Sequence, residues 1–310
     1  MATKGDKEIE AILKAIDEGI IDFQEAIPNI QEKIYSKLLL FQKELSVQGE
    51  TITNTVKNVK LLSNIKQDIE SIILDDTDYL EAVAKFSKLY DKVTALNYSY
   101  FKSIESKFKP SKVIEEVRKQ SVSLVIDGLT EAGLQTNFIN PVREIINTYV
   151  TTGGSYSKLS GELNNYINGY NSDAGPIDGS FVKFTKQITT DAINQYNAQV
   201  NQITSADLGW EWFRYIGSNI KTTRTFCEAL TKKEYYHRSE LAQIIKGNFK
   251  EFKEMKGEIY NKTGLPQGMY DDTNTSNFPI YRGGYNCGHQ AYAIPTYLVP
   301  QKVKNLIAIK

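Results

Sequence analysis

Regular spacing of apolar residues over the first 206 positions most limits what this chain can fold into. Apolar side chains recur every three or four residues in four successive series, which begin at Ile9, Ile30, Val56 and Leu80. This period places each series on one face of an α-helix. Helices of this length joined by short turns predict long hairpins packed as a bundle or coiled coil over residues 1–110.

The breaks between the series carry residues that begin or end helices. Pro28 suits the first turn of a helix, and Asp75 to Asp78 offer side-chain oxygens that can cap the next one. Pro110 ends the fourth series, because proline cannot continue the hydrogen-bond ladder of a helix. The first 206 residues contain neither Cys nor His. We therefore expect this part of the chain to serve association rather than chemistry.

A second helical region follows over residues 111–206 and ends in a polar helix over residues 181–205. Near Gly209 the pattern changes, because residues 210–217 and 290–298 are rich in aromatic and β-branched side chains, which favour strands. Short helices and loops are expected between these two strands. The sequence therefore predicts a mainly α protein with a small α+β domain over residues 207–310.

Composition is that of a soluble globular protein. The 310 residues are 41% hydrophobic and 24% charged, with a formal net charge of zero. No apolar run approaches the roughly 20 residues of a membrane span, and the charged N-terminus lacks the apolar core of a signal peptide. We expect a cytoplasmic site of synthesis and no membrane partner. Residues 207–310 are mildly basic, with 15 Lys and Arg against 10 Asp and Glu.

All Cys and His residues of the chain fall in the C-terminal region: Cys227, His237, Cys287 and His289. Thiolate and imidazole are the ligands of tetrahedral Zn²⁺, and four of them would close a structural site. Two alternatives to this zinc site stay open for the cysteines. The cysteines could be small buried apolar groups with His237 on the surface. A disulfide between them is disfavoured, because the cytoplasm keeps thiols reduced.

The same residues allow two catalytic interpretations. A cysteine paired with His289 could form a thiolate–imidazolium dyad. A nuclease could use His237 or His289 as base, with Arg224 or Arg282 holding phosphate. No P-loop, dinucleotide-binding fingerprint or paired-carboxylate metal motif accompanies them. Because the acid–base groups are so few, we expect no enzymatic activity.

A basic segment in the same region alternates lysines with Phe249 and Phe252. Aromatic side chains among basic ones can dock nucleic acid. A solvated amphipathic helix that also carries Glu251 and Glu254 is the favoured interpretation. The candidate phosphate contacts are Lys246, Lys250, Lys253 and Lys256.

Two segments of the C-terminal region carry a resemblance. The first is WEWFRYIGSNIKTTRTFCEAL, residues 210–230, and the second is YRGGYNCGHQAYAIP, residues 281–295. In this order they resemble the C-terminal domain of tailed-phage minor head proteins, the Mu-F-like head morphogenesis family, over residues 207–298. The motif positions are Trp210, Arg224, Thr225, Gly283, Gly284 and Asn286.

The chain departs from the family pattern at two places. The family has an acidic residue before the Arg-Thr pair, where this chain has Lys221, Thr222 and Thr223. Gly288 replaces the usual arginine between Cys287 and His289. The resemblance implies a structural protein of the virion, made in the host cytoplasm and placed at the portal vertex of the head. It also implies the portal protein, other head proteins and packaged DNA as partners.

Overall fold

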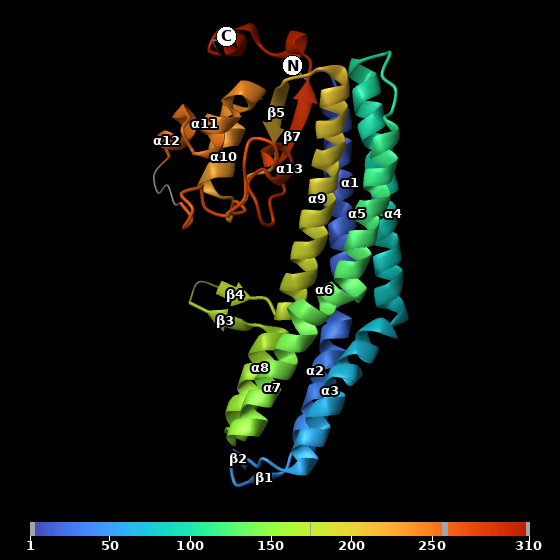
Figure 1. Ribbon diagram of the computed structural model, residues 1–310, viewed down its shortest axis with the longest axis vertical. Helices are drawn as coiled ribbons and strands as arrows, with labels where there is room; N and C mark the ends of the chain where they lie inside the picture. Colours follow the sequence, from blue (N-terminus) through green and yellow to red (C-terminus); the bar gives the residue numbers. More distant parts are fainter. Residues whose placement is uncertain (1–3, 174, 256–259, 308–310) are drawn as a thin grey trace. The chain divides into compact units, whose positions relative to one another are not determined.

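The computed structural model describes residues 4–173, 175–255 and 260–307, and helices dominate them (Figure 1). The predicted class, mainly α with a small α+β C-terminal region, is confirmed. Contacts divide the chain into two compact units, each built from separate stretches of sequence. Unit 1 comprises Met1–Asp17, Leu89–Ser121 and Thr190–Lys310, and unit 2 comprises Glu18–Lys88 and Val122–Thr189.

Residues 110 and 206, where the sequence pattern changes, both lie inside unit 1. The regions 1–110, 111–206 and 207–310 are thus divisions of pattern, and their independent folding stays a prediction. Within the described residues, no helix is both long and apolar enough to cross a membrane. The long helices that contribute to both units are α1 (Asp6–Gln24), α4 (Thr77–Ile104), α5 (Lys112–Thr130) and α9 (Ser180–Leu208).

Unit 2 has a helical bundle at its centre. In this bundle α2 packs against α3 and α8, and α7 packs against the same two helices. Each helix buries a stripe of side chains four residues apart, such as Ile30, Ile34 and Leu38. The expected bundle packing of apolar stripes is confirmed here. The bounds are α2 (Ile27–Glu44), α3 (Val56–Leu74), α7 (Asn140–Thr152) and α8 (Tyr156–Asn168).

Side-chain caps and glycine set the ends of these helices. Asp76 Oδ1 accepts the Tyr79 backbone N–H at 2.9 Å at the start of α4, as the Asp-rich break predicts. Gly153 ends α7 with φ 68°, a left-handed cap that favours glycine. Shorter elements complete the unit: hairpins β1 (Val47–Gln48) with β2 (Thr51–Ile52) and β3 (Tyr170–Ser172) with β4 (Gly175–Ile177), the one-turn α6 (Ala132–Leu134), and the π-helix η1 (Gln135–Ile139).

Unit 1 holds an antiparallel sheet in the order β6-β5-β7. The central strand is β5 (Trp212–Ile216), flanked by β6 (Tyr235–His237) and β7 (Gln290–Ile294). In this register Trp212 lies opposite both His237 and Ile294, and Ile216 lies opposite Gln290. Both strands expected from aromatic content are therefore present and pair with each other.

Short helices fill the chain between these strands, beside the sheet in Figure 1. The short helices and loops expected between the two strands are present among the described residues. The helices between β5 and β7 are α10 (Thr225–Lys233), η2 (Arg238–Glu240), α11 (Leu241–Ile245), α12 (Lys250–Lys253) and α13 (Phe278–Tyr281), while η3 (Thr296–Leu298) and α14 (Gln301–Lys304) follow β7.

A buried chain of amides joins the sheet to α4 and α9 inside unit 1. Asn197 donates to Gln290 at 3.0 Å and accepts from Asn97 at 2.7 Å. Asn201 donates back to Asn97 at 3.0 Å, and Gln290 donates to Asn194. Because these side chains are buried, each amide needs its partners to offset the loss of water. The polar character of the helix at residues 181–205 thus has a structural cause.

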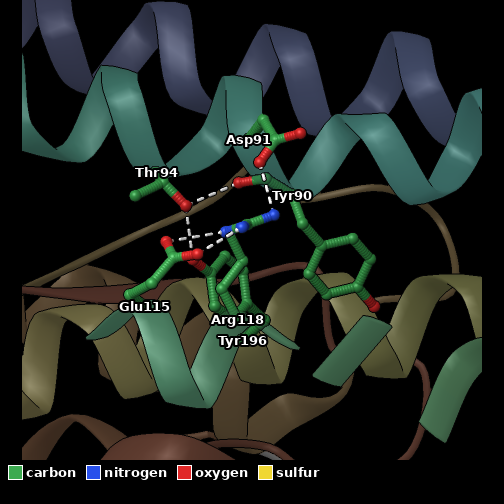
Figure 2. Close-up of polar contacts among 6 residues, drawn as sticks. All are labelled: Tyr90, Asp91, Thr94, Glu115, Arg118 and Tyr196. Atoms are coloured by element: carbon green, nitrogen blue, oxygen red, sulfur yellow. Dashed lines mark hydrogen bonds and ion pairs between the residues drawn. The ribbon is translucent and has the colours of Figure 1, made fainter. Parts of the chain in front are cut away.

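A second polar cluster ties α5 to α4 and α9 in the same unit (Figure 2). Arg118 reaches Asp91 and Glu115, each at 2.5 Å. Thr94 donates to the Tyr90 carbonyl at 2.6 Å and also bonds the Tyr196 hydroxyl. Burial raises the pKa of Tyr196 to about 12, so its phenol stays neutral. We interpret the cluster as structural, because its polar contacts link these helices to one another.

Replacing Asn197 should destabilise unit 1 strongly. The change Asn197→Ala deprives Asn97 and Gln290 of buried partners, and each loss costs about 1–3 kcal/mol. We expect the free energy of unfolding to fall by about 2–4 kcal/mol in urea titrations followed by tryptophan fluorescence. Gln187→Ala, an exposed amide on the same helix, is the control and should change little. Equal effects of the two would contradict the amide chain.

Candidate metal centre

Arg224 brings the two motif segments together. It directly precedes α10, with φ −70° and ψ 144°, and its side chain does not cap the helix. The guanidinium instead donates to the main-chain oxygens of Gly283, at 2.9 Å, and Tyr285. A planar fork of donors can hold two carbonyls at once, which a lysine cannot do. The start of α10, at Thr225, is thereby fixed to the loop before β7.

The two cysteines meet beneath this clamp. Cys227 lies on α10 and Cys287 in the loop, and their sulfurs are 3.8 Å apart and unlinked. Both side chains are buried. A side chain on Gly283 would place its Cβ 2.4 Å from the Cys227 sulfur and 3.0 Å from the Cys287 sulfur. Gly283 therefore has to lack a side chain for the sulfurs to occupy this position.

Tyr215 and His289 complete the cluster from the sheet. The Tyr215 hydroxyl lies 3.6 Å from the Cys227 sulfur and 3.7 Å from the Cys287 sulfur. The His289 ring stacks on the Tyr215 ring, with centroids 5.6 Å apart and planes 7° apart. Nε2 of His289 contacts Asn219 Oδ1 at 3.2 Å, which leaves its other nitrogen for the cysteines. All these groups belong to unit 1.

Cys227, Cys287 and His289 form a group that could hold a metal ion. Their ligand atoms lie within 4.8 Å of one another, and all three residues are buried. Two thiolates and one imidazole are donors suited to Zn²⁺ and other soft or borderline metals. Of the four Cys and His residues that the sequence places in this region, the structure brings three together.

His237 does not join this group. It ends β6 opposite Trp212, whereas His289 lies beyond the other end of β5, next to Gly217. Its Nδ1 accepts the Ser239 N–H at 3.2 Å, and its Nε2 lies 3.4 Å from Glu211. His237 is also buried, not on the surface. The predicted four-ligand set is corrected to three because strand register separates the two histidines.

The environment of the sulfurs favours one thiolate. The Cys227 thiol donates to Cys287 and holds the pKa of Cys287 well below its usual range, and His289 and Arg282 act in the same direction. The same bond, together with burial, raises the pKa of Cys227. Burial raises the pKa of Tyr215 well above its usual value. The groups around the two sulfurs therefore stabilise negative charge on Cys287 rather than on Cys227.

Of the remaining motif residues, Gly284 and Asn286 shape the loop before β7, and Trp210 packs on α4. Gly284 has φ 84°, and a Cβ there would lie 1.9 Å from the Gly268 carbonyl oxygen. Asn286 adopts φ 54°, and its N–H donates to Asp191 Oδ1 at 2.6 Å. Burial raises the pKa of Asp191. Trp210 packs on Phe101 of α4, with ring centroids 5.9 Å apart.

Sequence reasoning missed Tyr215 and Asp191. Alternation along β5 puts Tyr215 on the same face as Gly217, the residue that His289 covers. The alternation of side chains along the strand could therefore have identified Tyr215, once Cys287 and His289 were taken as candidate metal ligands. Nothing in the sequence pattern singles out Asp191 on its polar helix.

The arginines of the catalytic interpretation are engaged elsewhere. Arg224 donates to two main-chain carbonyls, as described above. Arg282 is 1% exposed, and its guanidinium donates to the carbonyls of Asn194 and Ile280. Neither guanidinium is therefore free to hold a phosphate without losing hydrogen bonds to main-chain carbonyls.

The basic segment divides into exposed lysines and buried rings. Phe249 and Phe252 are buried against Phe226, with ring centroids 5.9 and 5.8 Å away. They are therefore core side chains and cannot stack on bases. Lys246, Lys250 and Lys253 are exposed, and Lys256 lies outside the described residues.

Comparisons with known proteins give no relative for this chain. No family model, curated protein or solved structure matches it.

Shortening the Arg224 clamp should loosen the loop. The change Arg224→Lys keeps the charge but cannot bond both carbonyls, and the lost bond is worth about 1.5–3 kcal/mol. Tryptophan fluorescence in urea should report this loss, because both tryptophans lie in unit 1. Arg143→Lys, at an exposed arginine on α7, is the control. An Arg224 variant as stable as the control would show that the clamp does not hold the loop.

Substitutions of His289 and of His237 should have different effects on zinc affinity. Loss of a ligand in His289→Asn should weaken zinc affinity at least 10–100-fold, the cost of losing even a supporting group. His237→Asn should leave affinity unchanged, since His237 lies outside the group. Chelator competition on the full chain measures both. Equal losses in the two variants would restore His237 as a ligand.

Proposed function

We propose that the chain is a structural minor head protein of a tailed bacteriophage, which acts in head assembly at the portal vertex. The observation that carries the proposal is the meeting of the two motif segments. Residues 210–230 and 281–295 stand in the order of the Mu-F-like family, and Arg224, Gly283, Cys227 and Cys287 of these segments contact one another. A motif that serves folding would make such internal contacts.

The surroundings of the polar groups support a structural role over a nuclease or hydrolase. Cys287 carries the lowered pKa of a nucleophile, but its side chain is 3% exposed. A substrate would have to open the loop to reach it. The arginines that would hold a phosphate instead fix main-chain carbonyls. These features suit a group that stabilises the fold.

In this proposal Zn²⁺ is the metal of the cluster. Cys227, Cys287 and His289 would hold it, and it would cross-link α10 to the loop before β7. A structural zinc supplies folding free energy directly, because the unfolded chain has no preformed site. Such a cross-link suits the long stretch between α12 and β7, whose described residues form little regular structure besides α13.

The proposed partners are those that the family resemblance implies. The portal protein and other head proteins would dock on the helical bundle, which offers long exposed faces. Packaged DNA would contact Lys246, Lys250 and Lys253 through its phosphates, since the neighbouring phenylalanines are buried. Mature protein would then reside in the virion after synthesis in the host cytoplasm.

Incorporation into heads tests this proposal. The chain should co-purify with portal-containing heads when it is expressed with the portal and head genes of its own phage. Heads assembled without the gene should lack a band of 35.1 kDa. Plasmid DNA should stay intact with the purified chain, with or without Mg²⁺ or Zn²⁺. Heads that assemble in the presence of the chain without incorporating it, or DNA cleavage that His289→Asn abolishes, would contradict the structural role.

A further inference from the structure

We infer that Tyr215 supplies the fourth metal ligand, so that the centre is a closed site of two sulfurs, one imidazole nitrogen and one phenolate oxygen. The inference rests on the zinc proposed above and names its complete coordination sphere. It assigns to Tyr215 the place that the sequence suggested for His237.

The distances between donor atoms carry the argument. In tetrahedral zinc with Zn–S bonds of about 2.3 Å, two sulfurs lie about 3.8 Å apart. An oxygen bound at about 2.0–2.2 Å lies about 3.5–3.6 Å from each sulfur. The Cys227 and Cys287 sulfurs are 3.8 Å apart, and the Tyr215 oxygen lies 3.6 and 3.7 Å from them. These three atoms already form one face of a zinc tetrahedron.

Strand geometry aims Tyr215 and His289 at this face together. Side chains two residues apart on a strand point to the same side, and His289 covers Gly217, two positions after Tyr215. The two rings lie nearly parallel, with planes 7° apart. The stacked rings therefore reach the sulfurs from the same side of the sheet, one with oxygen and one with nitrogen.

The charges near the cluster fit an anionic site. Two thiolates, one phenolate and Zn²⁺ sum to one negative charge, which is costly to bury alone. Arg282 acts on Cys287 and Arg224 on Cys227 through their positive charges. Arg282 is buried and its Nε has no hydrogen-bond partner among the described residues. The positive charge of the buried Arg282 guanidinium would thus offset the negative charge of the metal centre.

Binding would proceed with proton release and no redox change. Zn²⁺ would form bonds to both sulfurs, to the phenolate oxygen and to neutral His289, while the protons carried by the sulfurs and by the Tyr215 phenol pass to solvent. Without the Tyr215 hydroxyl, one proton fewer is released and a water fills the fourth position.

Titration of the metal-free full chain with Zn²⁺ at neutral pH, under a non-chelating reductant, tests the assignment. Ultraviolet difference spectra should show ionisation of one tyrosine per zinc bound. A dye in weak buffer should record one proton more than Tyr215→Phe releases. Chelator competition should find that Tyr215→Phe binds zinc at least 10–100-fold more weakly.

Tyr236→Phe is the matched control, because Tyr236 is a buried tyrosine of the neighbouring strand whose hydroxyl lacks a partner among the described residues. It should keep the difference band and the affinity of the unaltered chain. Tight zinc binding without a tyrosinate band would overturn the Tyr215 assignment and leave the zinc site standing. No zinc binding by the unaltered chain would overturn both.

Discussion

Contact between two sulfurs 3.8 Å apart joins chain segments that are 60 residues apart in sequence. The other features of the site depend on that contact. The sulfurs can meet only because Gly283 has no side chain. Arg224 holds the loop carbonyls over them. Asp191 fixes the backbone of Asn286 next to Cys287. Each of these contacts fixes one segment of main chain. Together they connect α10 to the loop before β7, which is a structural role.

The sheet and its helices depend on a different kind of interaction. Buried amides on α4 and α9 bond one another and Gln290 at the start of β7. Because unpaired buried polar groups are costly, these bonds favour the one register between the elements that forms them. The same strand β7 follows directly on His289. The amide chain and the candidate metal centre therefore position the two ends of one short segment.

Much of the fold could be predicted from the sequence, because local signals decide it. Apolar stripes gave the helices, Asp76 and Pro28 marked helix starts, and aromatic content marked β5 and β7. The division into units could not be predicted. It depends on which distant segments pack together, and the pattern change near Gly209 does not report that.

The site was predictable only in part for a related reason. Composition singled out Cys227, His237, Cys287 and His289 together, since reactive ligand types are rare in this chain. Whether His237 or Tyr215 completes the group depends on strand register. Register places His237 at the Trp212 end of β5 and His289 near its Ile216 end. Composition alone cannot show at which end of β5 each histidine lies. It also favours histidine over tyrosine as a metal ligand.

Zinc-edge X-ray absorption of the full chain, purified under reducing conditions without added metal, tests the central claim most directly. That claim is that the sulfurs of Cys227 and Cys287 hold a metal. We predict a first shell of two sulfurs at about 2.3 Å and two lighter atoms at about 2.0–2.1 Å. A shell made only of nitrogen and oxygen, or purified protein that contains no metal, would contradict the account.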